Sequence, residues 1–218
     1  MSPAAQSWAA VVPVKRLPLA KTRIALPADL RAELALAIAA DTVAACRATS
    51  AVARIVVVTD DEDAAARLAE LGAVVVPDAP DAGLNPALRH GAAFAAVGEM
   101  PVGVVALSSD LPALTAADLG SVLERAGEAA MSFVADAAGT GTTLLAARSV
   151  DLFDPQFGPD SAQRHRDVGA VDLSDAAGTR VRRDVDTLAD LMDAVRLGCG
   201  PAVTALLAAH PDLLRRTS

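Results

Sequence analysis

Short apolar runs alternate with stretches of helical periodicity along the first half of the chain. The runs with the length and β-branched content of strands are residues 9–14, 54–60, 73–76 and 102–107. The predicted helices are residues 29–47, residues 61–71, ended by Gly72, and residues 86–97, with Pro86 in the first turn. Residues 102–107 are apolar at consecutive positions, which predicts a strand buried on both faces of a parallel sheet.

The second half continues this alternation less regularly. Thr115 is the predicted N-cap of a helix ending near residue 126, and two strands, 131–135 and 142–147, are predicted around a turn at 139–141. The remaining predicted elements are a polar loop entering a short helix (157–167), an edge strand (180–186) and two closing helices (187–196 and 201–210). This order predicts an α/β fold with a mostly parallel central sheet and helices on both faces. We expect a single domain, residues 1–218, with its core at about residues 9–207.

Composition narrows the class of protein. With 53% hydrophobic and 21% charged residues, the 218-residue chain has enough apolar side chains for a large core. Only 2% of the residues are aromatic and the net charge is −8. Because stacking platforms and a broad basic surface are both lacking, we expect no nucleic-acid partner.

Cysteine content and hydropathy indicate the cellular compartment of the protein. The two cysteines, Cys46 and Cys199, are too few and too far apart to suggest a disulfide framework or a zinc site, which favours a reducing compartment. The chain has no run of about 20 apolar residues and no basic segment ahead of an apolar run at its N-terminus. We therefore expect a cytoplasmic protein without a membrane partner.

Four cations follow the first predicted strand within nine residues: Lys15, Arg16, Lys21 and Arg23. Ligands of open α/β sheets bind beyond the carboxyl ends of the strands, so this basic loop (residues 15–23) is a candidate anion site. A triphosphate in particular needs several positive donors. The alternative is a solvated loop whose cations pair with surface carboxylates. No Gly-x-x-x-x-Gly-Lys-Ser/Thr sequence occurs, which disfavours a P-loop nucleotide hydrolase.

Three carboxylates have the chemistry of a magnesium site. Asp110 follows the most hydrophobic strand, and Asp184 and Asp186 flank Val185, so both face the same side of an extended chain. Hard oxygen ligands on Mg²⁺ are the usual companions of nucleotidyl transfer. The alternative for Asp184 is an ion pair with Arg182 or Arg183, and the alternative for Asp186 is a helix cap beside Thr187.

Two segments rich in small residues, 139–143 and 157–161, are either ordinary turns or sources of backbone N–H groups and hydroxyls for a phosphate or carboxylate. The cluster Arg164, His165 and Arg166 is either an additional set of donors or a solvated helix face. His90 and His210 are predicted at the surface or at helix ends, and neither pattern indicates a ligand.

In combination these motifs resemble the guanylyltransferases of coenzyme F-420 biosynthesis, which act on 2-phospho-L-lactate or, in actinobacterial relatives, on phosphoenolpyruvate. The segments that carry the resemblance are residues 12–17, 20–23, 83–88, 109–112, 139–142, 157–161 with His165, and 184–187. Segments 157–161 and 184–186 are the more specific parts. The basic loop and Asp110 are shared with the wider nucleotidyltransferase superfamily, including molybdopterin guanylyltransferases. The glycine-rich start of the first loop is missing in this chain, as in its relatives, and residues 12–14 stand in its place. Fewer backbone N–H donors are then available, so the resemblance implies that the cations carry more of the phosphate binding.

The resemblance implies roles for individual residues. The implied nucleotide-binding residues are Lys15, Lys21, Arg23, Leu84 and Asn85, and the three cations together with Asp110 are the implied catalytic set. The implied Mg²⁺ ligands are Asp110, Asp184 and Asp186, and the implied acceptor-binding residues are Thr142, Gly158 and Ser161.

The implied reaction transfers GMP from GTP to the phosphate of a three-carbon acid and releases pyrophosphate. The resemblance implies that a downstream transferase uses the product, and we expect that transferase as a partner. Two alternatives remain from the sequence: a molybdopterin or sugar-phosphate nucleotidyltransferase of the same fold, and a GTP-binding module without turnover. No motif distinguishes phosphoenolpyruvate from 2-phospho-L-lactate or 3-phosphoglycerate as the acceptor.

Overall fold

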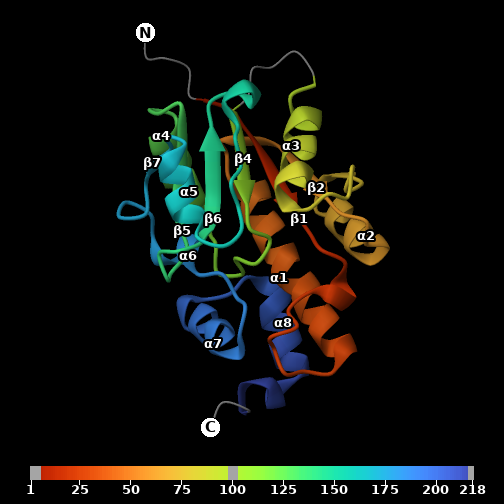
Figure 1. Ribbon diagram of the computed structural model, residues 1–218. Helices are drawn as coiled ribbons and strands as arrows, with labels where there is room; N and C mark the ends of the chain where they lie inside the picture. Colours follow the sequence, from red (N-terminus) through yellow and green to blue (C-terminus); the bar gives the residue numbers. More distant parts are fainter. Residues whose placement is uncertain (1–5, 98–102, 216–218) are drawn as a thin grey trace.

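A seven-stranded sheet in the order β3-β2-β1-β4-β6-β5-β7 forms the centre of the molecule (Figure 1). The computed structural model describes residues 6–97 and 103–215; residue 102, the predicted first residue of one strand, and both ends of the predicted domain lie outside the described residues. The strands are β1 (Trp8–Pro13), β2 (Val52–Val58), β3 (Val74–Val76), β4 (Gly103–Leu107), β5 (Met131–Ala135), β6 (Thr142–Ala147) and β7 (Val171–Asp172). The helices are α1 (Ala28–Ala48), α2 (Glu62–Glu70), α3 (Leu84–Ala95), α4 (Ala116–Ala126), α5 (Ser161–Asp167), α6 (Thr179–Arg182), α7 (Leu188–Leu197) and α8 (Pro201–Ala209).

Strand direction is parallel through most of the sheet, which confirms the predicted architecture. β1 pairs in parallel with both β2 and β4, β2 with β3, and β5 with β7. β6 is the exception, because it runs antiparallel between β4 and β5. The amino end of β6 therefore lies at the same edge of the sheet as the carboxyl ends of β1 and β4.

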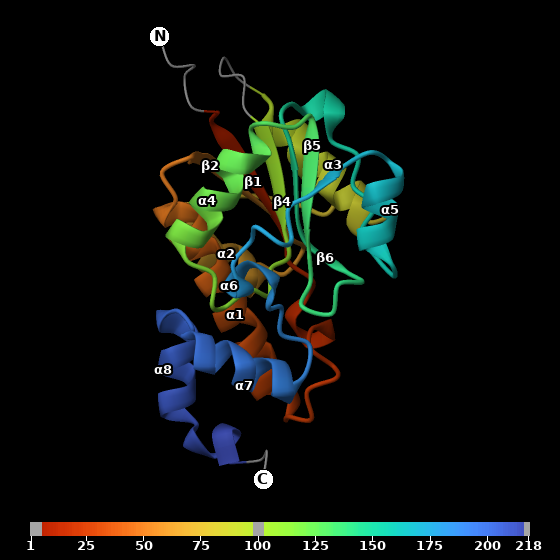
Figure 2. The same cartoon turned by 90° about the vertical axis from the view of Figure 1, so that its left-hand side faces the viewer.

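Alternate residues of β1 enter two different cores. Trp8, Ala10 and Val12 pack with α1, α2 and α4, whereas Ala9 and Val11 pack with α3 and α5 on the opposite face. Period-two alternation explains this division, since successive side chains of a strand point to opposite faces. Both faces of the sheet are thus covered by helices, as Figure 2 shows from the side.

A third core joins the closing helices to the rest of the molecule. Leu34 and Ile38 of α1 are fully buried against Leu191 of α7 and Val203 of α8. The two helices lie beyond one end of the sheet, beside the extension of α1 (Figure 2). Among the described residues no single helix is long and apolar enough to cross a membrane; only α7 and α8 taken together meet that criterion, and they are bent by 118°.

One predicted strand is wrong, and one helix begins earlier than predicted. Residues 180–186 form no strand, because Thr179–Arg182 is one helical turn and Arg182 donates to the carbonyls of Ala135 and Asp136. The strand at that edge of the sheet is instead the two-residue β7, too short to give a periodic signal. Helix α3 begins at Leu84, two residues before the predicted start, so Leu84 and Asn85 lie in its first turn and not in a loop.

Helix α3 approaches the sheet closely because Gly91 has no side chain. A Cβ at Gly91 would lie 2.6 Å from a methyl of Val11 and 2.7 Å from a methyl of Val58. Gly120 in α4 is the matched case, since a Cβ there would meet only Thr49, at 3.9 Å.

We predict that Gly91→Ala lowers the free energy of unfolding by about 1–3 kcal/mol, because overpacking outweighs the ~1 kcal/mol that Ala contributes to a helix. Gly120→Ala should be neutral or stabilising by up to about 1 kcal/mol. Urea unfolding of the two variants measures both effects. Equal stability of the two variants would contradict the close approach of α3.

Candidate active site

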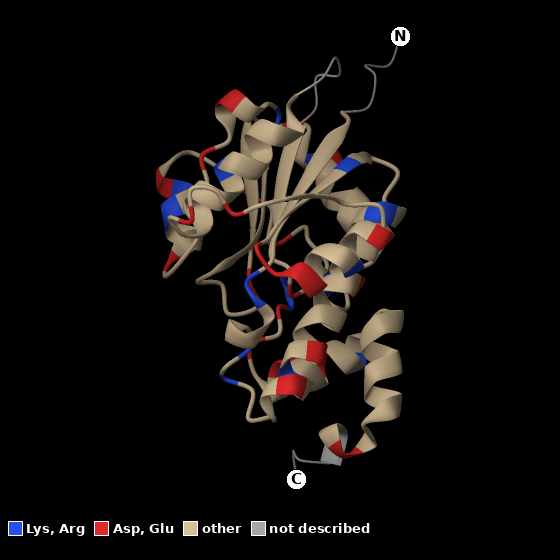
Figure 3. Cartoon of the chain, turned by 90° about the vertical axis from the view of Figure 1, so that its right-hand side faces the viewer, with Lys and Arg blue, Asp and Glu red and all other residues tan. Residues whose placement is uncertain are grey.

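Strand direction brings four segments to one edge of the sheet. The basic loop follows β1, residues 108–112 follow β4, and β6 begins there at Thr142. Val185 N donates to Asp110 O at 3.1 Å, which attaches the segment 183–187 to the same edge. In Figure 3 positive and negative segments meet in this region, between the sheet and the helices beyond it.

The basic loop is held in place at several points. Leu17, in a 3-10 helix (Leu17–Leu19), and Ile24 are both buried. Asp61 accepts a hydrogen bond from the Leu17 N–H at 2.8 Å and also caps α2 by accepting from the Ala64 N–H at 3.0 Å. This anchoring role of Asp61 was not predicted, although the sequence signal was there, because Asp61 immediately precedes a helix. The basic loop is therefore attached to the rest of the molecule at Leu17 and Ile24.

Lys21 is the cation at the centre of the site. Its Nζ lies 2.6 Å from Asp110 Oδ2 and 3.3 Å from Asp186 Oδ1, and only 11% of its side chain is exposed. Burial lowers the pKa of Lys21, but the charges and hydrogen bonds of Asp110 and Asp186 outweigh burial and hold that pKa above its ordinary value. Lys21 is thus positively charged and joins two of the three predicted metal ligands.

The other cations of the loop are more accessible. Arg23 Nη1 lies 3.2 Å from Asp186 Oδ2 with 75% of its side chain exposed, and Arg16 lies 3.6 Å from Asp60. Lys15 is exposed directly after β1. Exposed ion pairs are weak, so Arg16 and Arg23 exchange partners at little cost.

Neither alternative considered for the acidic segment occurs. Thr187 caps α7 in a capping box with Asp190, so Asp186 is not the cap. Arg182 donates to backbone carbonyls, and Arg183 lies 3.6 Å from both Asp190 and Asp193. The Asp184 carboxylate therefore has no arginine partner among the described residues.

The carboxylates are suited to a divalent cation. Burial raises the pKa of Asp184 to about 7, and the charges of Asp110, Asp136 and Asp186 contribute to the shift. Asp110 Oδ1 is buried and, within the described residues, lacks a hydrogen-bond partner. Such a group of acids without enough positive charge has the donor chemistry that Mg²⁺ prefers. Across residues 6–97 and 103–215, however, no three acidic, His or Cys side chains are already assembled around one point.

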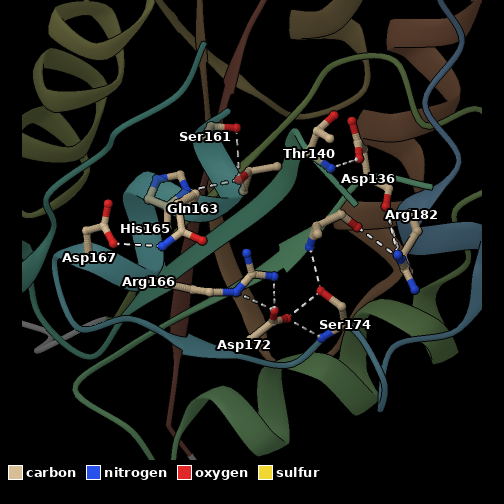
Figure 4. A network of polar contacts seen from close by, with 12 residues as sticks. Asp136, Thr140, Ser161, Gln163, His165, Arg166, Asp167, Asp172, Ser174 and Arg182 are labelled. Carbon is tan, nitrogen blue, oxygen red and sulfur yellow. Dashed lines mark hydrogen bonds and ion pairs between the residues drawn. The ribbon is translucent and has the colours of Figure 1, made fainter. Parts of the chain in front are cut away.

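A second cluster of polar side chains lies at the start of β6 (Figure 4). Ser161 Oγ and Thr142 Oγ1 are 3.0 Å apart, and Thr142 Oγ1 is 2.9 Å from His165 Nδ1. The Gln156 N–H donates to His165 Nε2 at 3.0 Å. Thr142, Ser161 and His165 are all buried, so the structure brings together two predicted acceptor-binding residues with a histidine whose role was left open.

Helix α3 holds the loop that carries the third acceptor-binding residue. The Asn85 side-chain amide donates to Phe157 O at 3.0 Å, and its carbonyl oxygen accepts from Phe157 N at 2.8 Å. Arg89 adds an ion pair with Asp154 at 2.8 Å. The Asn85 amide is therefore committed to the backbone beside Gly158, whereas Leu84 is 38% exposed.

Several backbone N–H groups expected to face an anion are used within the protein. Asp136 accepts from the N–H groups of Thr140 and Gly141. The N–H groups of Ser161 and Ala162 donate to the carbonyls of Gly158 and Thr140. The hydroxyls of Thr142 and Ser161 thus have the larger part in any anion site here.

The backbone conformation favours glycine at position 158. Its φ is +122°, and a Cβ there would lie 2.9 Å from Arg164 Nη2. Arg164 itself folds back over this turn and donates to Pro159 O. Arg166 instead pairs with Asp172 at 2.6 Å and lies over the Phe133 ring, which makes it a structural residue.

We predict a pH-dependent contribution of His165 to stability. Burial is the main cause that lowers the pKa of His165 to about 4, followed by the charge of Arg164. Unfolded histidine titrates near pH 6.5, so the unfolded state binds more protons between about pH 6.5 and 4. This stabilisation is fully present above pH 6.5 and is lost, by about 3 kcal/mol, as the pH falls to 4. Urea unfolding of the wild type and His165→Asn across this range measures the difference; parallel pH profiles would contradict a neutral buried His165.

Comparison with known proteins places the chain in a family. Residues 8–174 match the family described as "Guanylyl transferase CofC like". The chain is 55% identical over 206 residues to a phosphoenolpyruvate guanylyltransferase from Thermomonospora curvata, covering 94% of this chain and 90% of that protein. It is 51% identical over 203 residues to a protein of the same name from Streptomyces coelicolor, covering 92% and 96%.

Solved structures agree on the fold. A nucleotidyl transferase from Methanothermobacter thermautotroptrophicus is similar with a TM-score of 0.56 and 19% identity, covering 88% of this chain and 97% of that one. A 4-diphosphocytidyl-2C-methyl-D-erythritol synthase is similar with a TM-score of 0.57 and 15% identity, covering 88% and 99%. Taken with the ion-paired basic loop and the acidic segment at one edge of the sheet, the match over residues 8–174 shows that this chain belongs to the CofC-like guanylyl transferase family.

Proposed function

We propose that this protein transfers GMP from GTP to the phosphate of phosphoenolpyruvate and releases pyrophosphate, as a step of coenzyme F-420 biosynthesis. The observation that carries the proposal is the contact of Lys21 with Asp110 and Asp186, which joins a basic loop and an acidic segment at the ligand-binding edge of the sheet. Family membership and the names of the similar proteins support guanylyl transfer and favour phosphoenolpyruvate over 2-phospho-L-lactate.

The reaction needs no side-chain nucleophile. A phosphate oxygen of the acceptor attacks the α-phosphorus of GTP, and the bond to the bridging oxygen breaks as pyrophosphate leaves. Because the acceptor phosphate is already ionised at neutral pH, the protein contributes positioning and charge neutralisation. Lys15, Lys21 and Arg23 hold the nucleotide phosphates. Guanosine lies beside the first turn of α3 at Leu84 and Asn85, where the Asn85 side-chain amide stays bound to the Phe157 backbone.

We propose Mg²⁺ as the cofactor, held by Asp110, Asp184 and Asp186. When bound, Mg²⁺ supplies positive charge that offsets the charge developing on the leaving pyrophosphate. Lys21 is ion-paired with two of these carboxylates, Asp110 and Asp186, and its single positive charge offsets one of their two negative charges. On substrate binding the Lys21 ammonium exchanges a carboxylate partner for a phosphate, which ties metal binding to nucleotide binding.

The acceptor site is proposed at Thr142, Gly158 and Ser161. The two hydroxyls and the turn at Gly158 lie where β6 begins, at the same edge as Asp110. The GDP-linked product is an activated donor for a downstream transferase of deazaflavin assembly, which we propose as a partner. Two free cysteines, the buried Cys46 and the half-buried Cys199, support a cytoplasmic location.

The decisive experiment measures pyrophosphate release with GTP and Mg²⁺ across a panel of phosphoenolpyruvate, 2-phospho-L-lactate, 3-phosphoglycerate, a sugar phosphate and molybdopterin. We expect release with phosphoenolpyruvate above all others. Release only with the sugar phosphate or molybdopterin would assign a different nucleotidyltransferase. No release with any acceptor, despite GTP binding, would indicate a binding module.

We predict that Asp184→Asn lowers turnover by roughly 100-fold, because a neutral amide is a much weaker Mg²⁺ ligand than a carboxylate. The fold should remain, since the substitution removes a buried like-charge group of nearly the same shape. Pyrophosphate release, Mn²⁺ binding by calorimetry and urea unfolding test the three parts of this expectation. Asp175→Asn, an exposed carboxylate outside the site, is the control. Near-wild-type activity of Asp184→Asn at limiting Mg²⁺ would remove Asp184 from the metal site.

We predict that Lys21→Ala raises the KM for GTP or lowers kcat by about tenfold or more, because a charge-assisted contact to phosphate is lost. Arg47→Ala, at the exposed end of α1, should leave both constants unchanged. Steady-state kinetics with GTP as the varied substrate compare the two variants. Equal effects would mean that the basic loop has no specific role in nucleotide binding.

A further inference from the structure

His165 is a fully buried imidazole between two parts of the proposed acceptor site. It lies on α5, with 0% of its surface exposed. Its ring packs 5.3 Å from the Phe157 ring and 5.6 Å from the Phe133 ring, measured between centroids, so its orientation is fixed by packing. One ring nitrogen contacts the loop before Gly158, and the other contacts the first residue of β6.

The contacts of the ring assign its tautomer. The Gln156 N–H can only donate, so His165 Nε2 is the acceptor and carries no proton. A neutral imidazole then carries its proton on Nδ1, which is 2.9 Å from Thr142 Oγ1. Nδ1 therefore directs its proton at the Thr142 hydroxyl oxygen, and the ring also has a hydrogen bond with the backbone of Ser161.

Protonation of Nδ1 limits where the hydroxyl protons of Thr142 and Ser161 can go. Thr142 and Ser161 have one hydroxyl proton each, and one of the two makes the 3.0 Å hydrogen bond between them. Because Nδ1 is already protonated, the second hydroxyl proton cannot be donated to His165. Among the described residues no other acceptor is within hydrogen-bond distance of either hydroxyl. One O–H group is thus left as a free donor.

We propose that His165 is a positioning residue for the acceptor: its protonated Nδ1 faces Thr142 Oγ1 and cannot accept a hydroxyl proton, which keeps one hydroxyl proton of the Thr142–Ser161 pair available for an anionic oxygen of the substrate. The inference rests on the proposed function, because the acceptor phosphate or carboxylate is the anion concerned. His165 does not touch substrate; it acts through Thr142. The same ring ties Gln156 to β6, so it also fixes the distance between the hydroxyl pair and Gly158.

Two amide variants separate the contact of His165 with Thr142 from its contact with Gln156. In His165→Asn the side-chain Nδ2–H₂ takes the place of Nδ1–H and retains a donor to Thr142. In His165→Gln the side-chain carbonyl takes the place of Nε2 and retains an acceptor for the Gln156 N–H, without a donor at the Nδ1 position. A merely structural role predicts that the variants differ only in stability, whereas a positioning role predicts a difference in acceptor KM.

We expect His165→Gln to raise the KM for phosphoenolpyruvate roughly tenfold, and His165→Asn to raise it about threefold at most. The KM for GTP should change less than about twofold in both. Thermal unfolding of both variants separates lost stability from lost positioning. The same acceptor KM in both variants, or a defect in the KM for GTP alone, would overturn the proposal.

A measurement on the wild type keeps the test independent of how the variants fold. Nitrogen-15 chemical shifts of the imidazole should show protonated Nδ1 and unprotonated Nε2 at pH 7; the opposite tautomer would overturn the proposal. A wild type that releases no pyrophosphate with any acceptor contradicts the proposed function itself. An active wild type with indistinguishable His165→Gln and His165→Asn contradicts only the positioning role.

Discussion

The buried ammonium of Lys21 is the interaction on which the site depends. It connects the loop after β1 with Asp110 after β4 and with Asp186 before α7, three segments that are far apart in the sequence. Removing one carboxylate would leave the cation partly uncompensated, and removing the cation would leave like charges facing one another. The electrostatic balance is therefore local, and a phosphate or a divalent cation that enters the site must alter it. An acidic protein thus keeps a local cluster of cations and carboxylates, which is where we propose that the anionic nucleotide binds.

The antiparallel direction of β6 determines at which edge of the sheet Thr142 lies. In a wholly parallel sheet the residue at this position would lie at the opposite edge, away from the basic loop. Because β6 reverses direction, its first residue, Thr142, lies near the ends of β1 and β4. The segments that carry Thr142 and Gly158, both proposed to bind the acceptor, are held from three sides, by Asn85 on α3, by His165 on α5 and by Asp136 after β5. The proposed nucleotide and acceptor sites thus share one edge, as an in-line transfer requires.

Hydrophobic pattern and capping chemistry were sufficient for most of the fold. The apolar run at β4, the cap at Thr115 and the helical period of α1 all predicted elements that the structure contains. The prediction was wrong where tertiary contacts outweighed local pattern. Residues 180–186 have the composition of an edge strand, but Arg182 donates to carbonyls of a neighbouring turn and Val185 donates to Asp110 O, so the backbone follows those partners and not a strand.

The sequence by itself determined the α/β class, the position of the basic loop and the identity of the acids, because strand period, charge and the resemblance to a family are all local or ordered along the chain. Only the tertiary structure decided how these residues pair. Asn85, which the resemblance placed at guanosine, uses its amide to hold the Phe157 backbone. The sequence offered two roles for His165, as a donor to a ligand or as part of a solvated helix face, but its ring is buried between the rings of Phe133 and Phe157. Such roles depend on contacts between residues up to 72 positions apart, and no pattern along the chain encodes those contacts.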